Sequence, residues 1–256
     1  MKPRILVSND DGIRAEGLAA LAAAVEPLGD VWVVAPETEQ SAASHALSLH
    51  RPLRIRRLKR HWFSIDGTPA DCVYLAVHQL MKDAAPTLVV SGINHGPNLA
   101  DDVIYSGTVA AAMEGCILGF PAIAFSLATR RELEFEGAAA FARAFVKAAL
   151  ANHIAKRTLI NVNVPVGGDP RKYEVTRLGR HSWTQAVVEK EDPRGRRYYW
   201  IGGNGYEHEH LPGTDCTAVH EHKCISVTPM MLDLTAQPAL DPLRKWPVKG
   251  FTQLKK

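Results

Sequence analysis

Two adjacent carboxylates follow the first apolar run of the chain. Asn9 follows the run that ends at Ser8, and then come Asp10, Asp11 and Gly12. Paired carboxylates at the end of a strand form a hard oxygen site of the kind that binds Mg²⁺ or Mn²⁺. A solvated polar turn explains most such triplets when they stand alone. The pair therefore indicates a metal site only if other segments supply further groups.

Further metal- and phosphate-type groups occur in three later loops, which contain Ser41, then Asn94 and Asn98, and finally Ser106, Gly107 and Thr108. The last loop precedes an Ala-rich segment, and free N–H groups at a helix start favour an anion. A polar surface loop or a plain helix cap is the alternative for each loop by itself. None of the loops has the pattern of a nucleophile elbow, a P-loop or a dinucleotide fingerprint. Together they favour phosphate chemistry at a metal.

The elements that must position these groups alternate along the first 165 residues. Apolar, strand-like segments are expected at 4–8, 31–35, 88–91, 121–126 and 159–164. Helices are expected at 16–28, 69–81, 108–118 and 135–150. Strands that are apolar throughout and separated by helices predict a mostly parallel, doubly wound α/β sheet covered on both faces. In such sheets, ligands bind at the carboxyl ends of the strands, where these loops lie.

The pattern of alternating strands and helices ends after Pro165. Segments 172–178, 183–188 and 197–201 are expected to form antiparallel strands joined by polar turns. The predicted hairpin exposes aromatic side chains at Trp183, Tyr198, Tyr199 and Trp200. Such a patch commonly pairs with a second subunit, and folding back onto the core is the alternative. We expect one domain over 1–256, with a core at about 1–165 and 224–235 and a hairpin at about 172–205.

Composition excludes several classes of protein. The 256 residues are 46% hydrophobic and 22% charged, with a net charge of +3, as in an ordinary globular protein. No basic run exceeds residues 54–60, so no stable nucleic-acid complex is expected. No apolar stretch reaches the ~20 residues that a membrane helix needs, and the first residues lack a signal-peptide core. Cys72, Cys116, Cys216 and Cys224 lack CxxC spacing, so free thiols and a cytoplasmic location are expected.

Histidines fall into two groups. His45 and His95 lie in loops near the expected site and are candidate proton donors to a leaving group. Segments 207–210 and 220–222 are rich in His and Glu. We interpret them as a solvated surface with adventitious metal affinity, since a structural zinc site needs four well-placed ligands.

Several blocks of the sequence closely resemble the SurE family, the stationary-phase survival proteins that act as 5′-nucleotidases. In the first half they are ILVSNDDG at 5–12, VVAP at 33–36 with Ser41, GTPADCV at 67–73, VSGIN at 90–94, GPN at 96–98 and YSGT at 105–108. In the second half they are NVNVP at 161–165, DPRG at 192–195, YW at 199–200, GTD at 213–215 and SVTP at 226–229. The resemblance thus covers nearly the whole chain.

The resemblance implies a Rossmann-like core with a C-terminal part used in dimer or tetramer assembly. It implies hydrolysis of nucleoside 5′-monophosphates, with 3′-nucleotidase and exopolyphosphatase side activities. One divalent ion per subunit, Mg²⁺ or Mn²⁺, would be held by Asp10, Asp11, Ser41 and Asn94. The residues with a direct catalytic part would be Asp10, Asp11, Asn98 and Ser106, and those that bind phosphate would be Asn94, Asn98, Ser106, Gly107 and Thr108.

Two departures from the family pattern are visible. His45 and His95 occupy family-variable positions, and Lys223-Cys224 stand where the family usually has Gly-Tyr. The second departure concerns local packing near the last strand and leaves the metal site intact.

Alternatives to this mechanism and function stay open. Water activated by the metal is the favoured nucleophile, and an aspartate that forms an aspartyl-phosphate is the alternative. A non-catalytic nucleotide-binding or regulatory oligomer on the same fold should lack one metal ligand, whereas all four candidates are present here. An oligomeric scaffold would not need the polar loops.

Overall fold

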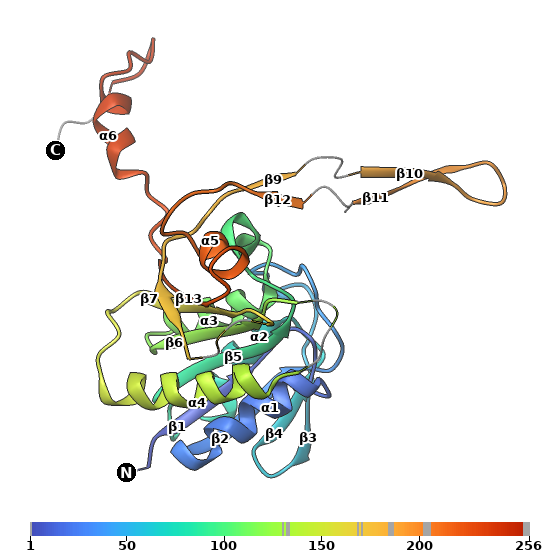
Figure 1. Ribbon diagram of the computed structural model, residues 1–256, viewed down its shortest axis with the longest axis vertical. Helices are drawn as coiled ribbons and strands as arrows, with labels where there is room; N and C mark the ends of the chain where they lie inside the picture. Colours follow the sequence, from blue (N-terminus) through green and yellow to red (C-terminus); the bar gives the residue numbers. More distant parts are fainter. Residues whose placement is uncertain are drawn as a thin grey trace.

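A single large sheet runs through the protein. The computed structural model describes residues 2–252 apart from 130, 132–133, 168, 170, 184–186 and 202–205. The central parallel strands are β1 (Arg4–Ser8), β2 (Asp30–Pro36), β4 (Trp62–Ile65), β5 (Leu88–His95), β6 (Ala122–Leu127) and β7 (Thr158–Val164). The outer strands are β3 (Ile55–Lys59), β13 (Ile225–Met231) and β8 (Tyr173–Val175). Among the described residues the order is β3-β4-β2-β1-β5-β6-β7-β13-β8 (Figure 1).

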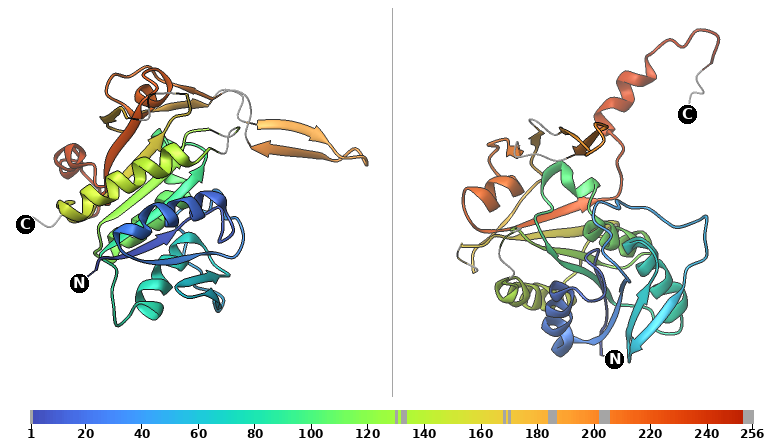
Figure 2. Two further views of the ribbon diagram at one scale, coloured as in Figure 1. Left: turned by 60° about the horizontal axis from the view of Figure 1, so that its bottom comes forward. Right: turned by 90° about the vertical axis from the view of Figure 1, so that its right-hand side faces the viewer.

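Helices cover both faces of this sheet (Figures 1 and 2). One face packs against α1 (Glu16–Val25) and α4 (Glu136–Ala151), and the other against α2 (Pro69–Leu75) and α3 (Gly107–Ile117). Successive side chains of β1 alternate between the two cores: Ile5 belongs to the first cluster and Leu6 to the second. The prediction of a doubly wound, mostly parallel α/β sheet is confirmed.

Several element boundaries differ from the expectation. The first helix ends at Val25, and the 3-10 turn η1 (Glu26–Leu28) follows because Pro27 cannot continue the helix. Regular α2 is likewise shorter than predicted and passes into the π-helical turn η2 (Ala76–Leu80). Strand β5 extends to His95, so Asn94 and His95 are strand residues and not loop residues. The short 3-10 turn η3 (Ala100–Ile104) then leads to α3.

The antiparallel pair β3 and β4 has no counterpart in the sequence-based expectation. β3 is almost wholly exposed and carries most of the basic run 54–60, so it lacks the apolar alternation that predicts a strand. Charged side chains on an edge strand discourage pairing with another chain. The basic run therefore serves as an edge of the sheet.

The C-terminal part contains an arm that leaves the body (Figure 1). Its inner pair is β9 (His181–Trp183) with β12 (Tyr206–His208), and its outer pair is β10 (Val187–Glu191) with β11 (Arg197–Ile201). Both pairs are antiparallel. The pair of β10 and β11 agrees with the predicted hairpin, whereas β12 lies outside the predicted strands. The side chain of Trp183 and the middle of the predicted strand 183–188 lie outside the described residues.

The prediction that segment 172–178 forms an antiparallel strand of the arm is wrong. Residues of β8 pair in parallel with β13, so this segment joins the main sheet. The sequence pattern gives strand character but not the partner, because partner choice depends on long-range packing. Two helices complete the chain, α5 (Asp215–His220) before β13 and α6 (Gln237–Arg244) after it.

Two expectations from the sequence concern the state of the cysteines and the presence of membrane-spanning helices. Cys72, Cys116, Cys216 and Cys224 are free and buried, as expected. In the part of the chain that the structure describes, no helix combines the length and apolarity needed to cross a bilayer.

The contact of α1 with the end of β5 leaves no room for a side chain at Gly17. A Cβ there would lie 2.0 Å from the Ile93 carbonyl oxygen, which is a backbone atom. Gly17→Ala should therefore lower the free energy of unfolding by about 1–3 kcal/mol, measured by urea unfolding. Ala23→Leu, an exposed change in the same helix, should stay within about 0.5 kcal/mol of the parent. Equal stability of the Gly17→Ala variant and the parent would contradict this packing.

Candidate active site

The candidate site lies where the strand order changes direction. From β1 the chain proceeds to β2 on one side, whereas β5 and β6 lie on the other side. The carboxyl ends of strands that flank such a switch point are the usual ligand site of an open α/β sheet. Asp10 and Asp11 follow β1, and Asn94 lies at the end of β5.

Asp10 packs against the first turn of α3. The Thr108 hydroxyl donates a hydrogen bond to Asp10 Oδ1. A Cβ built at Gly107 would lie 2.6 Å from Asp10 Cβ, so the helix can approach only because this residue is glycine. Ser106 caps the helix, with its Oγ accepting from Val109 N at 3.1 Å. Asp10 therefore lies in direct contact with the segment that is predicted to bind phosphate.

Burial dominates the electrostatics of the two acids. Desolvation raises the pKa of Asp10 from 3.8 to about 6, the Thr108 hydrogen bond opposes the rise, and the Asp11 charge adds to it. Burial also raises the pKa of Asp11, although the His95 amide donates to its Oδ2 at 3.3 Å. Two adjacent carboxylates whose pKa values are raised by burial are candidate functional groups.

A network of amides fixes Asn98. The Asn98 backbone N–H donates to Asn163 Oδ1 at 2.8 Å, and its side-chain Nδ2 donates to Ser126 Oγ at 2.8 Å. The Asn98 carbonyl accepts from Asn161 Nδ2 at 2.8 Å and from Asn163 Nδ2 at 2.9 Å. Donors and acceptors from β6 and β7 thus hold the loop after β5 in one position. Sequence reasoning did not assign a role to Ser126, Asn161 or Asn163, although two Asn two residues apart share one face of a strand.

Asn94 and Ser41 have different surroundings. Asn94 Nδ2 donates to the Gly96 carbonyl at 2.8 Å, which fixes its side chain near the end of β5. Ser41 is exposed, and its hydroxyl donates to Glu39 Oε1 at 2.6 Å. No hydrogen bond among the described residues joins Ser41 to Asp10 or Asp11. Its loop is nevertheless fastened to the site, since Gln40 N donates to the Asp10 carbonyl at 2.8 Å.

Two polar groups near the acids were not singled out from the sequence. The charge of Glu39 raises the pKa of Asp11, which places a third carboxylate close to the pair. Asn9 is fully buried, and its Nδ2 donates to the Gly12 carbonyl at 3.0 Å. That bond closes the turn that presents Asp10 and Asp11.

The two candidate proton donors are held differently. His45 Nε2 lies 2.7 Å from Glu114 Oε2, and Glu114 is a buried acid of α3. The charge of His95 lowers the pKa of Asp11, so this ring lies close to the acidic pair. Its Nε2 is buried and has no hydrogen-bond partner among the described residues. Of the two histidines, His95 is the one whose charge acts on Asp11.

The C-terminal His and Glu residues are brought together. One ligand atom of each of His208, His210 and Glu221 lies within 4.8 Å of the others. Burial, with the neighbouring charges of His208 and Lys223, lowers the pKa of His220 to about 4. The interpretation of this region as wholly solvated is wrong for His220, whose Nε2 is buried.

Comparisons with known proteins identify the relatives of this chain. A family model described as "Survival protein SurE" matches residues 5–185. The 5′-nucleotidase SurE of Myxococcus xanthus is 61% identical over 250 residues, which are 98% of this chain and 95% of the relative. The 5′-nucleotidase SurE of Vibrio cholerae (strain O395) is 47% identical and is matched over 96% of this chain and 93% of the relative.

A solved structure is similar as well. The crystal structure of the SurE protein from Aquifex aeolicus superposes with a TM-score of 0.84 at 40% identity, covering 94% of this chain and 98% of that chain. The resemblance stated from the sequence motifs is confirmed by these matches over nearly the whole length. The chain belongs to the SurE family.

Proposed function

We propose that this protein is a metal-dependent phosphohydrolase that removes phosphate from nucleoside 5′-monophosphates. The contact of the Asp10 carboxylate with the first turn of α3 carries the proposal, because it sets an acidic metal ligand beside N–H groups that favour an anion. The relatives named 5′-nucleotidase SurE support the same substrate class. Action on 3′-monophosphates and polyphosphate belongs to the proposal as side activities.

The residues of the site fit one divalent cation. Burial has raised the pKa of both Asp10 and Asp11, and a cation would relieve their repulsion. Asn94 offers a neutral oxygen, and Ser41 joins the set once its hydroxyl turns away from Glu39. An all-oxygen set suits Mg²⁺ or Mn²⁺. When bound, the cation would polarise a phosphate oxygen and make a coordinated water a better nucleophile.

The rest of the site binds and orients the phosphate. Ser106 keeps its hydroxyl at the start of α3, where the amides of Gly107 and Thr108 begin the helix. These donors face negative charge that grows on the non-bridging oxygens, and loss of one preorganised donor costs roughly a hundredfold in rate. Asn98 is fixed by its amide network and needs no reorganisation when substrate binds. His95 is the proposed proton donor to the leaving alkoxide.

The assembly proposed for this chain is a homodimer or homotetramer that uses the arm. Tyr199, Trp200 and Ile201 on β11 are 58%, 62% and 91% exposed, on a pair of strands that leaves the body. A second copy would cover this apolar surface. The division into one domain, with its core at about 1–165 and 224–235, and the cytoplasmic location are part of the same proposal.

Loss of the first acid should abolish the activity. Asp10→Asn removes a charged metal ligand, so its rate should fall by far more than the roughly hundredfold cost of one lost donor. The assay follows phosphate release from a panel of 5′- and 3′-monophosphates and polyphosphate with Mg²⁺ or Mn²⁺. A chelator should abolish release, and Asp83→Asn, an exposed acid in a distant loop, should act like the parent. Nucleotide binding without release from any substrate would overturn the proposal in favour of a regulatory module.

Metal affinity should depend on pH around the Asp10 pKa of about 6. Below that pH a proton competes with the cation, so affinity should fall about tenfold per pH unit, whereas at higher pH this carboxylate adds no further change. Calorimetric titration with Mn²⁺ measures the curve. Thr108→Val removes a hydrogen bond that lowers the Asp10 pKa, so the pH below which Mn²⁺ affinity falls should rise. Thr108→Ser keeps the hydroxyl and should leave that pH unchanged. A flat affinity between about pH 5 and 7 would contradict the role of Asp10.

The arm should control the oligomeric state. Trp200→Ser removes the largest apolar side chain of β11 and should shift the molar mass toward the monomer, measured by light scattering after gel filtration. Lys190→Ser, on the paired strand β10, is the matched polar control and should leave the mass unchanged. An unchanged mass for Trp200→Ser would place the subunit contact elsewhere.

A further inference from the structure

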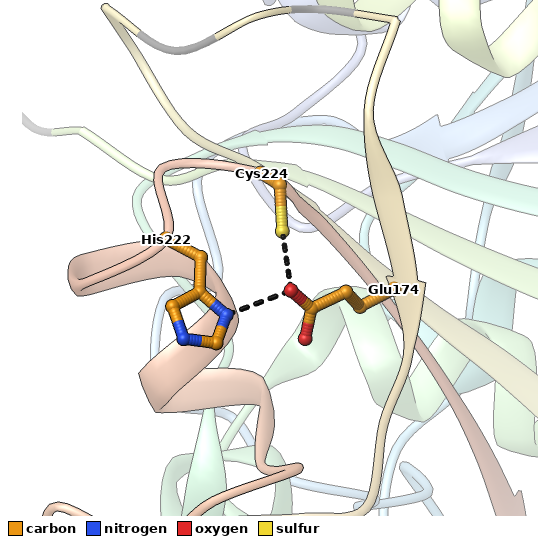
Figure 3. Close-up of side chains that lie close together, drawn as sticks. All are labelled: Glu174, His222 and Cys224. Carbon is orange, nitrogen blue, oxygen red and sulfur yellow. Dashed lines mark hydrogen bonds and ion pairs between the residues drawn. The ribbon is translucent and has the colours of Figure 1, made fainter.

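Three side chains of different chemistry, Glu174, His222 and Cys224, converge near the edge of the main sheet (Figure 3). His222 Nδ1 lies 2.7 Å from Glu174 Oε1, and Cys224 Sγ donates to the same oxygen at 3.3 Å. Glu174 comes from β8, His222 from the turn after α5, and Cys224 from the residue before β13. Three segments that are separate in the sequence therefore point their polar atoms at one position.

The three ligand atoms lie slightly closer together than the ligands of a small metal site. The ligand atoms all lie within 4.8 Å of one another. Tetrahedral zinc bonds of about 2.0–2.3 Å set neighbouring ligand atoms roughly 3.4–3.6 Å apart. His222 and Glu174 have side chains that are 50% and 38% exposed, so they can open by less than about 1 Å to reach that spacing. Cys224 is only 4% exposed and forms the fixed inner wall.

The donor set selects the kind of cation. A thiolate, an imidazole and a carboxylate suit Zn²⁺ and other borderline-soft ions, whereas Mg²⁺ and Mn²⁺ prefer oxygen alone. One thiolate and one carboxylate balance a charge of +2. Burial and the Glu174 hydrogen bond raise the pKa of the Cys224 thiol to about 11 in the absence of metal, so binding must displace a proton.

We propose that Glu174, His222 and Cys224 bind one zinc-class cation, with water as the fourth ligand, at a site separate from Asp10 and Asp11. The ion would tie the short edge strand β8 to β13 and to the end of α5. Along the chain β8 precedes the arm and α5 follows it, so the ion would join the two segments that flank the arm.

A second group of possible ligands lies nearby but differs in chemistry. His208, His210 and Glu221 offer two imidazoles and a carboxylate without sulfur, and His210 has a side chain that is 79% exposed. A cation held there would have no thiolate bond. That difference gives the two clusters distinct optical signatures.

Cobalt(II) is the probe that tests the proposal. The full-length protein, with its Asp10 site filled by excess Mg²⁺, is titrated with Co²⁺ while the near-ultraviolet thiolate-to-cobalt charge-transfer absorption is recorded. The parent should show this absorption with one ion bound per chain. Cys224→Ser should lose it, and Cys116→Ser, a change at a cysteine that is equally buried at 4% exposure, should keep it.

Two further variants guard against a folding defect. Glu174→Gln and His222→Gln alter half-exposed side chains, so both should fold and bind Co²⁺ at least about tenfold more weakly. Zn²⁺ at about a hundredfold excess over its Kd should raise the Tm of the parent by roughly 5–10 °C and should not raise that of His222→Gln.

Three results would overturn the proposal. One is the absence of charge-transfer absorption in the parent, and another is its persistence in Cys224→Ser. The third is a bound cobalt ion with only weak visible absorption, which would assign the ion to His208, His210 and Glu221.

Discussion

The buried carboxylate of Asp10, pressed against the start of α3, is the interaction on which the rest of the site depends. Asp10 is 5% exposed, and its pKa is raised to about 6. Burial of an acid is costly unless a cation or hydrogen bonds compensate it. The Thr108 hydroxyl supplies one such bond, and the glycine at 107 lets the helix come close enough to make it.

The fold supplies this contact by placing the start of α3 beside the end of β1. The end of β5 approaches from the neighbouring position, where the His95 amide reaches Asp11. Ends of β6 and β7 hold Asn98 through Ser126, Asn161 and Asn163. The ends of β1 and β5 thus meet at Asp11, the ends of β6 and β7 fix Asn98, and the rigid sheet holds these strand ends at fixed separation. Sites built on rigid elements keep catalytic geometry better than sites on loops alone.

Much of this arrangement could be predicted because it depends on the residue pattern of short, continuous segments of the sequence. Fully apolar runs predicted β1, β2, β5, β6 and β7, and the parallel rule then brought their ends together. Asp10, Asp11 and the Ser106–Thr108 segment were recognisable from residue type and position after such runs. The family motifs added the expected chemistry of each group but not its geometry.

The parts that could not be predicted depend on partners far apart in the chain. The charged strand β3 has no apolar alternation, and β8 joined β13 in the main sheet where a hairpin was expected. The bond of Ser41 to Glu39 and the amide network of Asn98 follow from side-chain packing, which no periodicity encodes. Convergence of Glu174, His222 and Cys224 is of the same kind, since it requires β8 to lie beside β13.

The edges of the sheet limit how copies of this chain can join. One border is β3, where Arg56, Arg57 and Lys59 face outward, and the opposite border is β8, only three residues long. Neither border offers the long, flat, uncharged ladder that would template growth of an open-ended fibre. The two borders of the main sheet therefore work against edge-to-edge pairing of one copy with the next, which is the contact that open filaments require.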